Sequence, residues 1–136
     1  MRRNIIVLIV LSVAVVLIGA CAQYGKQQAT TQLATAPLGN AVEMTADAFT
    51  PNTLTINAGD TVTWTNKDTN AHWPASAMHP THEVYPETGG CIGSTFDACK
   101  EIAPGESWSF TFNQAGSWKY HDHLNPAGPK GTIVVQ

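Results

Sequence analysis

The chain has 136 residues, with seven Lys and Arg against ten Asp and Glu, so its formal net charge is −3. Both arginines, Arg2 and Arg3, lie in a predicted leader, and without them five Lys face ten acids, a net charge near −5. Because phosphate recognition depends on Lys and Arg, this composition argues against a nucleic-acid partner.

Residues 1–21 have the parts of a secretory signal: two arginines, an apolar run over residues 5–18 and small residues before Cys21. The last four, Ile-Gly-Ala-Cys, resemble a bacterial lipobox, in which the cysteine becomes the lipidated N-terminus. The alternative is an uncleaved transmembrane anchor. Both alternatives predict an extracytoplasmic domain, in the periplasm or at the cell surface, that is tethered to a membrane.

Residues 22–40 are mostly Gln, Thr, Ala and Gly, with too few large apolar side chains to fold, and we expect a flexible tether. Residues 41–136 are close to the smallest size that supports its own core. The predicted organisation is therefore a leader, a tether and one folded domain.

The domain contains short segments in which apolar and polar side chains alternate, with turn residues between them. Alternation with a period of two and many β-branched or aromatic residues is typical of half-buried strands. The segments with this pattern are 42–49, 54–56, 61–65, 107–112, 117–123 and 132–135. No helical period of useful length is present, so we expect an all-β fold, a small β-sandwich.

The segment from Trp73 to Ala103 shows no clear strand and is long for a connection inside a compact domain. Loops of this length are usually functional or disordered. Because this one carries two histidines and two cysteines, we expect one long ordered loop folded over an end of the sandwich.

Cys91 and Cys99 are the cysteines that remain once Cys21 is assigned to a lipid. In an oxidising compartment, an even pair so close in sequence predicts a disulfide. Closing so short a loop stabilises the fold by roughly 2–3 kcal/mol. The alternative, a pair of thiolate metal ligands, is less favoured because their spacing is not a recognised ligand spacing.

All five histidines of the chain fall in three short segments. His121 and His123 are two apart in a predicted strand, so both imidazoles share one face of it. His79 and His82 frame a Pro-Thr pair that can bring two imidazoles together in one tight turn, and His72 follows a predicted strand. We predict metal ligands at all five positions; the alternative is solvated polar residues at a strand end and in a loop.

Strand alternation also predicts which face of the strand carries the histidine pair. Trp118 and Tyr120 should face the core, which leaves His121 and His123 on the other face of their strand. A metal bound there is completed either by a neighbouring chain, in a homo-oligomer, or by the histidines of the long loop. Asp122 is either a further ligand or an acceptor that fixes a histidine tautomer.

The framework motifs of the domain are Gly-Asp-Thr-Val-Thr-Trp-Thr-Asn at 59–66, Pro104-Gly105 and Gly-Thr-Ile-Val-Val at 131–135. In these motifs the domain resembles the cupredoxin family, the plastocyanin and amicyanin group. The resemblance implies a Greek-key β-sandwich with a copper site at one pole, where His72 stands at the position of the first histidine ligand.

The expected copper site departs from that family. Blue-copper sites use a cysteine thiolate from the last loop, and the resemblance places that position on Asp122 or His121, so type 1 copper is not expected. The segment 116–123 is instead similar to the Gly-Thr-Tyr-Trp-Tyr-His-Ser-His strand of the first domain of multicopper oxidases, whose histidines hold copper. Pro74 stands where those enzymes have a further histidine.

Neutral imidazoles on such a fold suit copper, as Cu(II) or Cu(I), with zinc second. Met78 has a thioether that suits Cu(I), although packing is the commoner role of such a methionine, and Glu83 is a ligand or a tautomer-fixing acceptor. Because imidazoles must lose a proton to bind, we expect the metal affinity to fall as the pH drops through roughly 6–7.

These observations predict a membrane-tethered, extracytoplasmic protein that binds one copper ion through histidines, for copper binding, delivery or electron transfer. Its expected partner is a redox or copper-donor protein. One alternative is a copper enzyme acting on oxygen, superoxide or nitrite, which is less favoured because Asp122 and Glu83 are the only acid–base candidates. The other alternative is a metal-free structural sandwich.

Overall fold

The structure is a computed structural model that describes residues 39–136. The predicted leader over residues 1–21, and all but the end of the predicted tether over residues 22–40, lie outside the described residues. Within the described part of the chain, no helix is long and apolar enough to cross a membrane.

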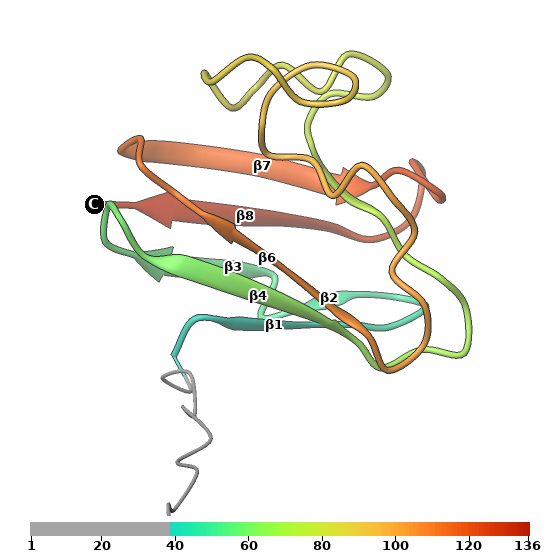
Figure 1. The fold of residues 1–136 in the computed structure, drawn as a ribbon. Helices are drawn as coiled ribbons and strands as arrows, with labels where there is room; N and C mark the ends of the chain where they lie inside the picture. The colour runs from blue at the N-terminus through green and yellow to red at the C-terminus, as the bar shows by residue number, and fades with distance from the viewer. Residues whose placement is uncertain (1–38) are drawn as a thin grey trace, which may run out of the picture. The chain divides into compact units, whose positions relative to one another are not determined.

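Eight strands form two four-stranded sheets that pack face to face (Figure 1). The strands are β1 (Ala41–Met44), β2 (Phe49–Thr50), β3 (Thr53–Ile56), β4 (Thr61–Asn66), β5 (Pro74–Ser76), β6 (Ser107–Thr111), β7 (Gly116–Asp122) and β8 (Lys130–Val135). One sheet has the order β2-β1-β4-β6 and the other the order β3-β8-β7-β5. The pairs β1–β4 and β3–β8 are parallel and the remaining pairs are antiparallel. This architecture confirms the predicted all-β sandwich.

The alternation of apolar and polar residues in β4 gives the strand one buried and one outward face, as the sequence predicts. Val62 and Trp64 are fully buried, whereas the threonines that alternate with them, at positions 61, 63 and 65, face outward. Those threonines form a ladder of hydroxyl hydrogen bonds with β6, at 2.7–2.9 Å. The two faces of this sheet are therefore held in different ways, one by apolar burial and the other by cross-strand hydroxyl pairs.

Aromatic side chains from both sheets and from the long loop meet in one core. The ring centroid of Trp64 lies 5.5 Å from those of Phe96 and Tyr120. Tyr120 stacks on Phe49, with 5.1 Å between their ring centroids. Phe96 belongs to the long loop and is fully buried. Burying one such ring stabilises a fold by roughly 1.5–3 kcal/mol, so the loop is tied to the core rather than loosely attached to it.

Strand β5 was not predicted from the sequence. It has only three residues, all of them buried, so it shows no alternation, and its first residue is Pro74. Proline is tolerated at the first residue of an edge strand because it has no N–H to donate to a ladder. The strand lies at the edge of its sheet, paired antiparallel to β7, with Ala75 opposite His121.

We predict that Gly131→Ala destabilises the protein. Gly131 pairs with Tyr120 across β7 and β8, and a methyl group there would overlap the tyrosine ring. Overpacking of this kind costs about 1–3 kcal/mol in the free energy of unfolding. Urea denaturation measures this loss, and Gly39→Ala, where nothing lies within 4 Å of the added group, is the matched control. Equal midpoints for the two variants would contradict the packing described here.

Candidate metal centre

Strand β7 and the residue directly after it present two histidines, His121 and His123, on the face turned away from the core. Tyr120 and Asp122 point to the opposite face, and both are buried. On the histidine face, the small side chain of Ala75 in β5 lies opposite His121 and leaves room for the imidazole. His123 follows the end of β7, and its N–H donates to the carbonyl of Trp73, just before β5, at 2.8 Å.

The long loop begins where β5 ends and folds back over this face. The N–H of Ala77 donates to the carbonyl of Lys119 in β7 at 2.8 Å, and the N–H of His82 donates to the carbonyl of Met78 at 2.9 Å. The loop therefore lies over β7 in Figure 1. Its histidine rings lie close to the other two, at 5.5 Å between the ring centroids of His79 and His121 and 4.8 Å between those of His82 and His123. The structure thus brings the loop histidines to the strand pair, as the second of the two predicted alternatives requires.

Four imidazoles converge in this way. His79, His82, His121 and His123 each offer a ring nitrogen, and these four atoms all lie within 4.8 Å of one another. The ring centroids are 4.8–6.3 Å apart. His82 and His121 are buried, whereas His79 is exposed, so the cluster has one edge open to solvent.

The structure does not bring His72 to the other four histidines. Its Nδ1 lies 2.8 Å from Oδ2 of Asp122 and its Nε2 lies 3.2 Å from Oδ2 of Asp68. The physical reason is strand alternation, because Asp122 lies between His121 and His123 and therefore points to the opposite face of β7. His72 and Asp122 are both almost fully buried and form a separate polar pair inside the sandwich.

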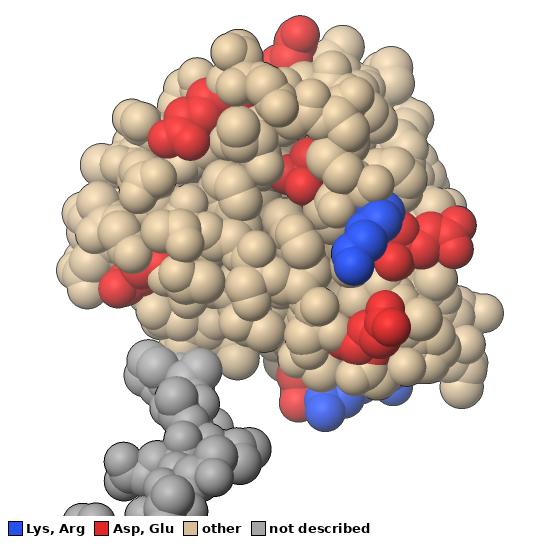
Figure 2. Space-filling view, viewed as in Figure 1, with Lys and Arg blue, Asp and Glu red and all other residues tan. Residues whose placement is uncertain are grey.

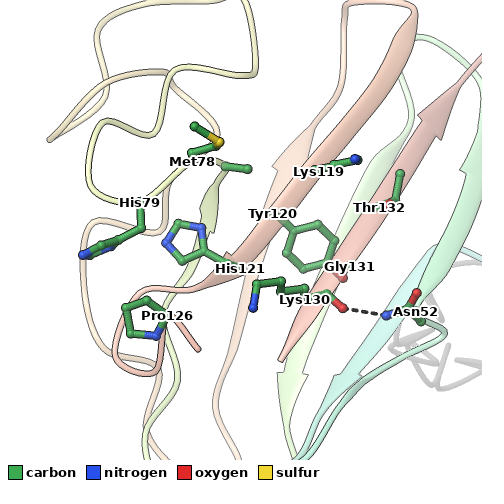
Figure 3. Close-up of a pocket in the computed structure, with 11 residues that line it drawn as sticks. Asn52, Met78, His79, Lys119, Tyr120, His121, Pro126, Lys130, Gly131 and Thr132 are labelled. Carbon is green, nitrogen blue, oxygen red and sulfur yellow. Dashed lines mark hydrogen bonds between the residues drawn. The ribbon is translucent and has the colours of Figure 1, made fainter. Parts of the chain in front are cut away.

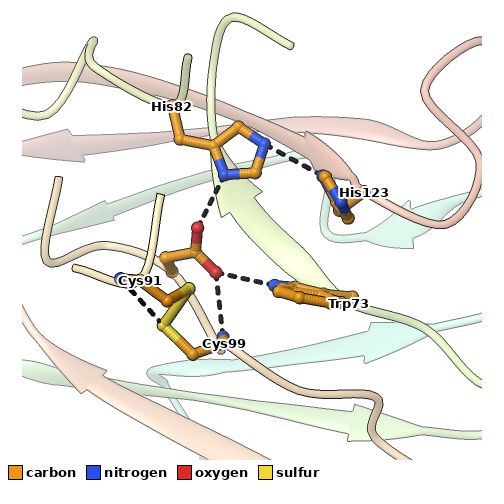
Figure 4. The surroundings of a disulfide bond; sticks show 6 residues. Trp73, His82, Cys91, Cys99 and His123 are labelled. Atoms are coloured by element: carbon orange, nitrogen blue, oxygen red, sulfur yellow. Dashed lines mark hydrogen bonds and ion pairs between the residues drawn. A yellow bond between two sulfur atoms is a disulfide. The ribbon is translucent and has the colours of Figure 1, made fainter. Parts of the chain in front are cut away.

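Asp97 of the long loop holds His82 in place. Its Oδ2 lies 2.6 Å from Nδ1 of His82, and both side chains are buried. Its other oxygen accepts hydrogen bonds from the indole N–H of Trp73 and the backbone N–H of Cys99, at 2.6 and 2.8 Å (Figure 4). Since a carboxylate only accepts, Nδ1 of His82 donates to Asp97, and in the neutral imidazole Nε2 therefore carries the lone pair.

That lone pair faces a second ring. Nε2 of His82 lies 3.0 Å from Nδ1 of His123. His82 has a φ of 54°, a left-handed conformation that is uncommon for a residue with a side chain. Residues held in such conformations cluster at functional sites. The position of His82 is therefore determined by its surroundings rather than by its own backbone preference.

Sequence analysis missed Asp97 and considered Glu83 and Asp122 for its role. Glu83 is exposed, and Asp122 binds His72 instead. The signal for Asp97 was weak, an acidic residue between the apolar Phe96 and Ala98 and close to a cysteine. Such a pattern indicates a buried acid, but it does not identify the histidine that the acid contacts.

Cys91 and Cys99 form the predicted disulfide (Figure 4), which confirms their pairing. The bridge encloses Asp97, which accepts a hydrogen bond from the backbone of Cys99. Within residues 39–136 there is no other cysteine, so no thiolate is offered to a metal by the described part of the chain while this bond is intact. The indole of Trp73 packs on the ring of His123 at 4.6 Å and closes this side of the cluster.

His121 is the most perturbed member of the cluster. Both of its ring nitrogens are buried, and neither has a hydrogen-bond partner in the described structure. Burial, and secondarily the three neighbouring histidines, lowers the pKa of His121 to about 4. Burial, followed by His82 and His79, also lowers the pKa of His123. Buried polar atoms without partners are rare in native proteins, and a bound water or ion is one of the explanations for them. Unprotonated imidazoles that face one another fit a divalent or monovalent transition metal.

The cluster lies in a domain of acidic character. Figure 2 shows acidic side chains at separate places on one face of the molecule and basic ones more rarely. This distribution gives no broad cationic surface on that face.

With this geometry in view, the sequence was compared with known proteins. It matches the family described as the cupredoxin-like domain over residues 8–135. The chain belongs to this family. It is 40% identical to plastocyanin of Scenedesmus fuscus over 89 residues, which are 65% of this chain and 86% of that protein. It is 37% identical over 93 residues to the chloroplastic plastocyanin of Tetradesmus obliquus, covering 65% of this chain and 58% of that longer protein.

Solved structures show the same fold. A purple cupredoxin from Nitrosopumilus maritimus has a TM-score of 0.57 at 21% identity, over 71% of this chain and 98% of that chain. Amicyanin from Paracoccus versutus has a TM-score of 0.55 at 24% identity, over 74% of this chain and 84% of that chain. The predicted cupredoxin sandwich is therefore confirmed.

We predict that the metal-free protein loses stability as the pH falls from about 6.5 to about 4. The unfolded chain takes up protons on its histidines near pH 6.5, but folded His121 does so only near pH 4, so protons favour the unfolded state between these values. Urea denaturation with a chelator present, at several pH values, measures the slope. His121→Asn should flatten it, and an identical slope in this variant would contradict the lowered pKa.

Proposed function

We propose that this cupredoxin-like protein is extracytoplasmic and membrane-tethered, and that it binds one copper ion through His79, His82, His121 and His123. Its role is copper binding with one-electron transfer to a redox partner. The observation that carries the proposal is the convergence of four imidazole nitrogens within 4.8 Å on a copper-protein fold.

The distances inside the cluster support a metal. The 3.0 Å between Nε2 of His82 and Nδ1 of His123 is close to the separation of two nitrogen ligands that lie about 2.0–2.1 Å from one ion at a right angle. Three or four imidazoles without a thiolate suit copper in tetragonal geometry, with zinc as the second candidate. His72, whose two nitrogens face carboxylates, is not part of the proposed ligand set.

The similar proteins support copper binding and an extracytoplasmic location. Two of them are plastocyanins, one of which is chloroplastic, and a solved amicyanin structure is that of a reduced Cu(I) form. Copper chemistry of this kind, together with the predicted lipobox and the disulfide, favours a compartment outside the cytoplasm. When bound, the ion would supply a Cu(II)/Cu(I) couple. The chain supplies a positioned set of imidazoles.

Partial exposure of the cluster favours exchange with a partner. His79 is exposed, whereas Asp97 and the disulfide hold His82 from behind. One exposed imidazole gives an electron, or a copper ion during loading, a short route to the surface. A second candidate function is a copper enzyme, because a hollow lined by His79 and His121 gives small molecules access to the same edge.

We predict one copper ion per chain, bound by nitrogen alone. Metal analysis together with electron paramagnetic resonance should show a wide parallel hyperfine splitting with nitrogen structure. His123→Gln should abolish stoichiometric binding, whereas His72→Gln should retain one copper, because only the first residue belongs to the cluster. A narrow splitting, which indicates a thiolate, or loss of copper in His72→Gln with the fold intact, would contradict the proposed ligand set.

We predict that Asp97→Asn weakens copper binding about 10–100-fold, as is typical for acceptors that orient a histidine ligand. The amide keeps the shape of the carboxylate but no longer requires the proton to lie on Nδ1 of His82. Competition titration with a chromophoric chelator measures the affinity, after circular dichroism has verified the fold. Glu83→Gln, which neutralises an exposed acid of the same loop, is the control and should bind as the parent does.

A further inference from the structure

Different surroundings hold different members of the histidine cluster. His79 and His121 border a hollow of about 500 Å³, and Figure 3 shows them next to each other there. Among the described residues that line this hollow, none belongs to the segment 91–99. His82 instead contacts that segment directly, and the disulfide closes the segment (Figure 4). His82 is therefore the member of the cluster that the disulfide segment holds.

The segment 91–99 holds His82 by its backbone and by its side chain. The N–H of Ser94 donates to the carbonyl of His82 at 2.9 Å, and Nδ1 of His82 donates to Oδ2 of Asp97 at 2.6 Å. All three residues are buried. Because both contacts come from residues between the two cysteines, the shape of this closed segment determines where the ring of His82 lies.

Cys99 connects the disulfide to Asp97. Its backbone N–H donates to Oδ1 of Asp97 at 2.8 Å, and its φ of 57° is a left-handed conformation that is uncommon for a residue with a side chain. Such a conformation persists where the surroundings impose it. The side chain of Cys99 is exposed, and the bridge to Cys91 restrains it covalently. We expect Cys99 to leave this conformation, and its N–H to leave Asp97, once the bridge is open.

The disulfide is accessible to a reductant, because both of its cysteines are exposed. A protein dithiol is the class of reductant that exchanges with such a bond. One thiolate of the dithiol attacks a sulfur of the bridge and releases the other sulfur, and its second thiolate then resolves the mixed disulfide. Two electrons and two protons thus pass to Cys91 and Cys99, and the dithiol leaves as a disulfide.

We propose that the disulfide of Cys91 and Cys99 is a redox switch for the imidazole site: the oxidised bridge holds Asp97 against His82, and its reduction by a dithiol weakens copper binding there. This inference rests on the proposed function and adds the regulation of the same site. Phe96 stays buried in the core, so the reduced loop remains attached, but Asp97 loses one of the N–H groups that orient it. His82 then loses the acceptor that keeps its proton on Nδ1, and its Nε2 carries the lone pair for only part of the time.

The test compares the Cu(I) affinity of the full chain with that of Cys91→Ser/Cys99→Ser, by competition with a chromophoric chelator. The serine pair stands for the reduced form, because free thiolates would bind Cu(I) themselves. Its affinity should be about 10-fold lower. Ile92→Ser, at an exposed position of the same segment, leaves the bridge intact and should bind as the parent does. In an Asp97→Asn background the serine pair should lower the affinity by less than about two-fold, because the bridge acts through that carboxylate.

A second measurement keeps the natural cysteines and needs no copper. Metal-free protein is reduced with dithiothreitol, desalted without oxygen and followed by ¹⁵N nuclear magnetic resonance of the histidine rings at about pH 8, where exposed imidazoles are neutral. On reduction, His82 should pass from the Nδ1–H tautomer to a mixture of both tautomers. Circular dichroism of the same samples verifies that the fold is retained.

An unchanged tautomer of His82, equal affinities of the serine pair and the parent, or unfolding of the chain on reduction would overturn the switch. An equal loss of affinity in both backgrounds would also overturn it, because the bridge would then act through overall stability rather than through Asp97. A parent chain that takes up no copper would instead refute the proposed function. The tautomer of the metal-free chain decides in either case whether the bridge controls His82.

Discussion

The short antiparallel pairing between β5 and β7 determines where every other part of the site lies. It places Ala75 opposite His121 and ties the backbone of Trp73 to that of His123. Because β5 is an edge strand, the chain that leaves it passes over the outer face of β7 without crossing another strand. The histidines that follow β5 therefore reach those of β7. A strand of three buried residues thus converts a surface-facing pair of imidazoles into a covered cluster.

The second constraint is the attachment of the long loop to the core. Phe96 is buried against Trp64, and the next residue, Asp97, holds the ring of His82. The disulfide of Cys91 and Cys99 closes the same segment. Apolar burial, a buried carboxylate and a covalent bridge therefore act on neighbouring residues. The position of His82, in spite of its left-handed backbone, is a consequence of all three.

Local pattern predicted part of this arrangement and could not predict the rest. Alternation in β7 placed His121 and His123 on one face, because that geometry depends only on the strand itself. The separation of His72 follows from the same alternation, which turns Asp122 inward, but its partner is 50 residues away and no local signal connects them. Strand β5 has no alternation to detect. The role of Asp97 depends on how a long loop closes, which is a property of tertiary packing rather than of spacing.

The family resemblance predicted the sandwich correctly, and the structure shows what lies at His72, the implied first ligand, and at Asp122, one of the two positions implied for the cysteine. His72 and Asp122 form a buried hydrogen-bonded pair there, at 2.8 Å. The imidazole cluster lies across β7 from that pair, on the face covered by the loop. One fold thus accommodates a buried polar pair where the family resemblance implied metal ligands, and a separate cluster of four imidazoles on the other side of the same strand.

The central claim is that imidazoles alone, from the loop and from the end of β7, surround a single ion. X-ray absorption spectroscopy on the copper-loaded full chain tests it most directly. The account predicts a shell of nitrogen scatterers at about 2.0 Å with the outer-shell pattern of imidazole and no sulfur shell. A copper–sulfur shell, or a shell made mainly of water oxygens without imidazole scattering, would contradict it.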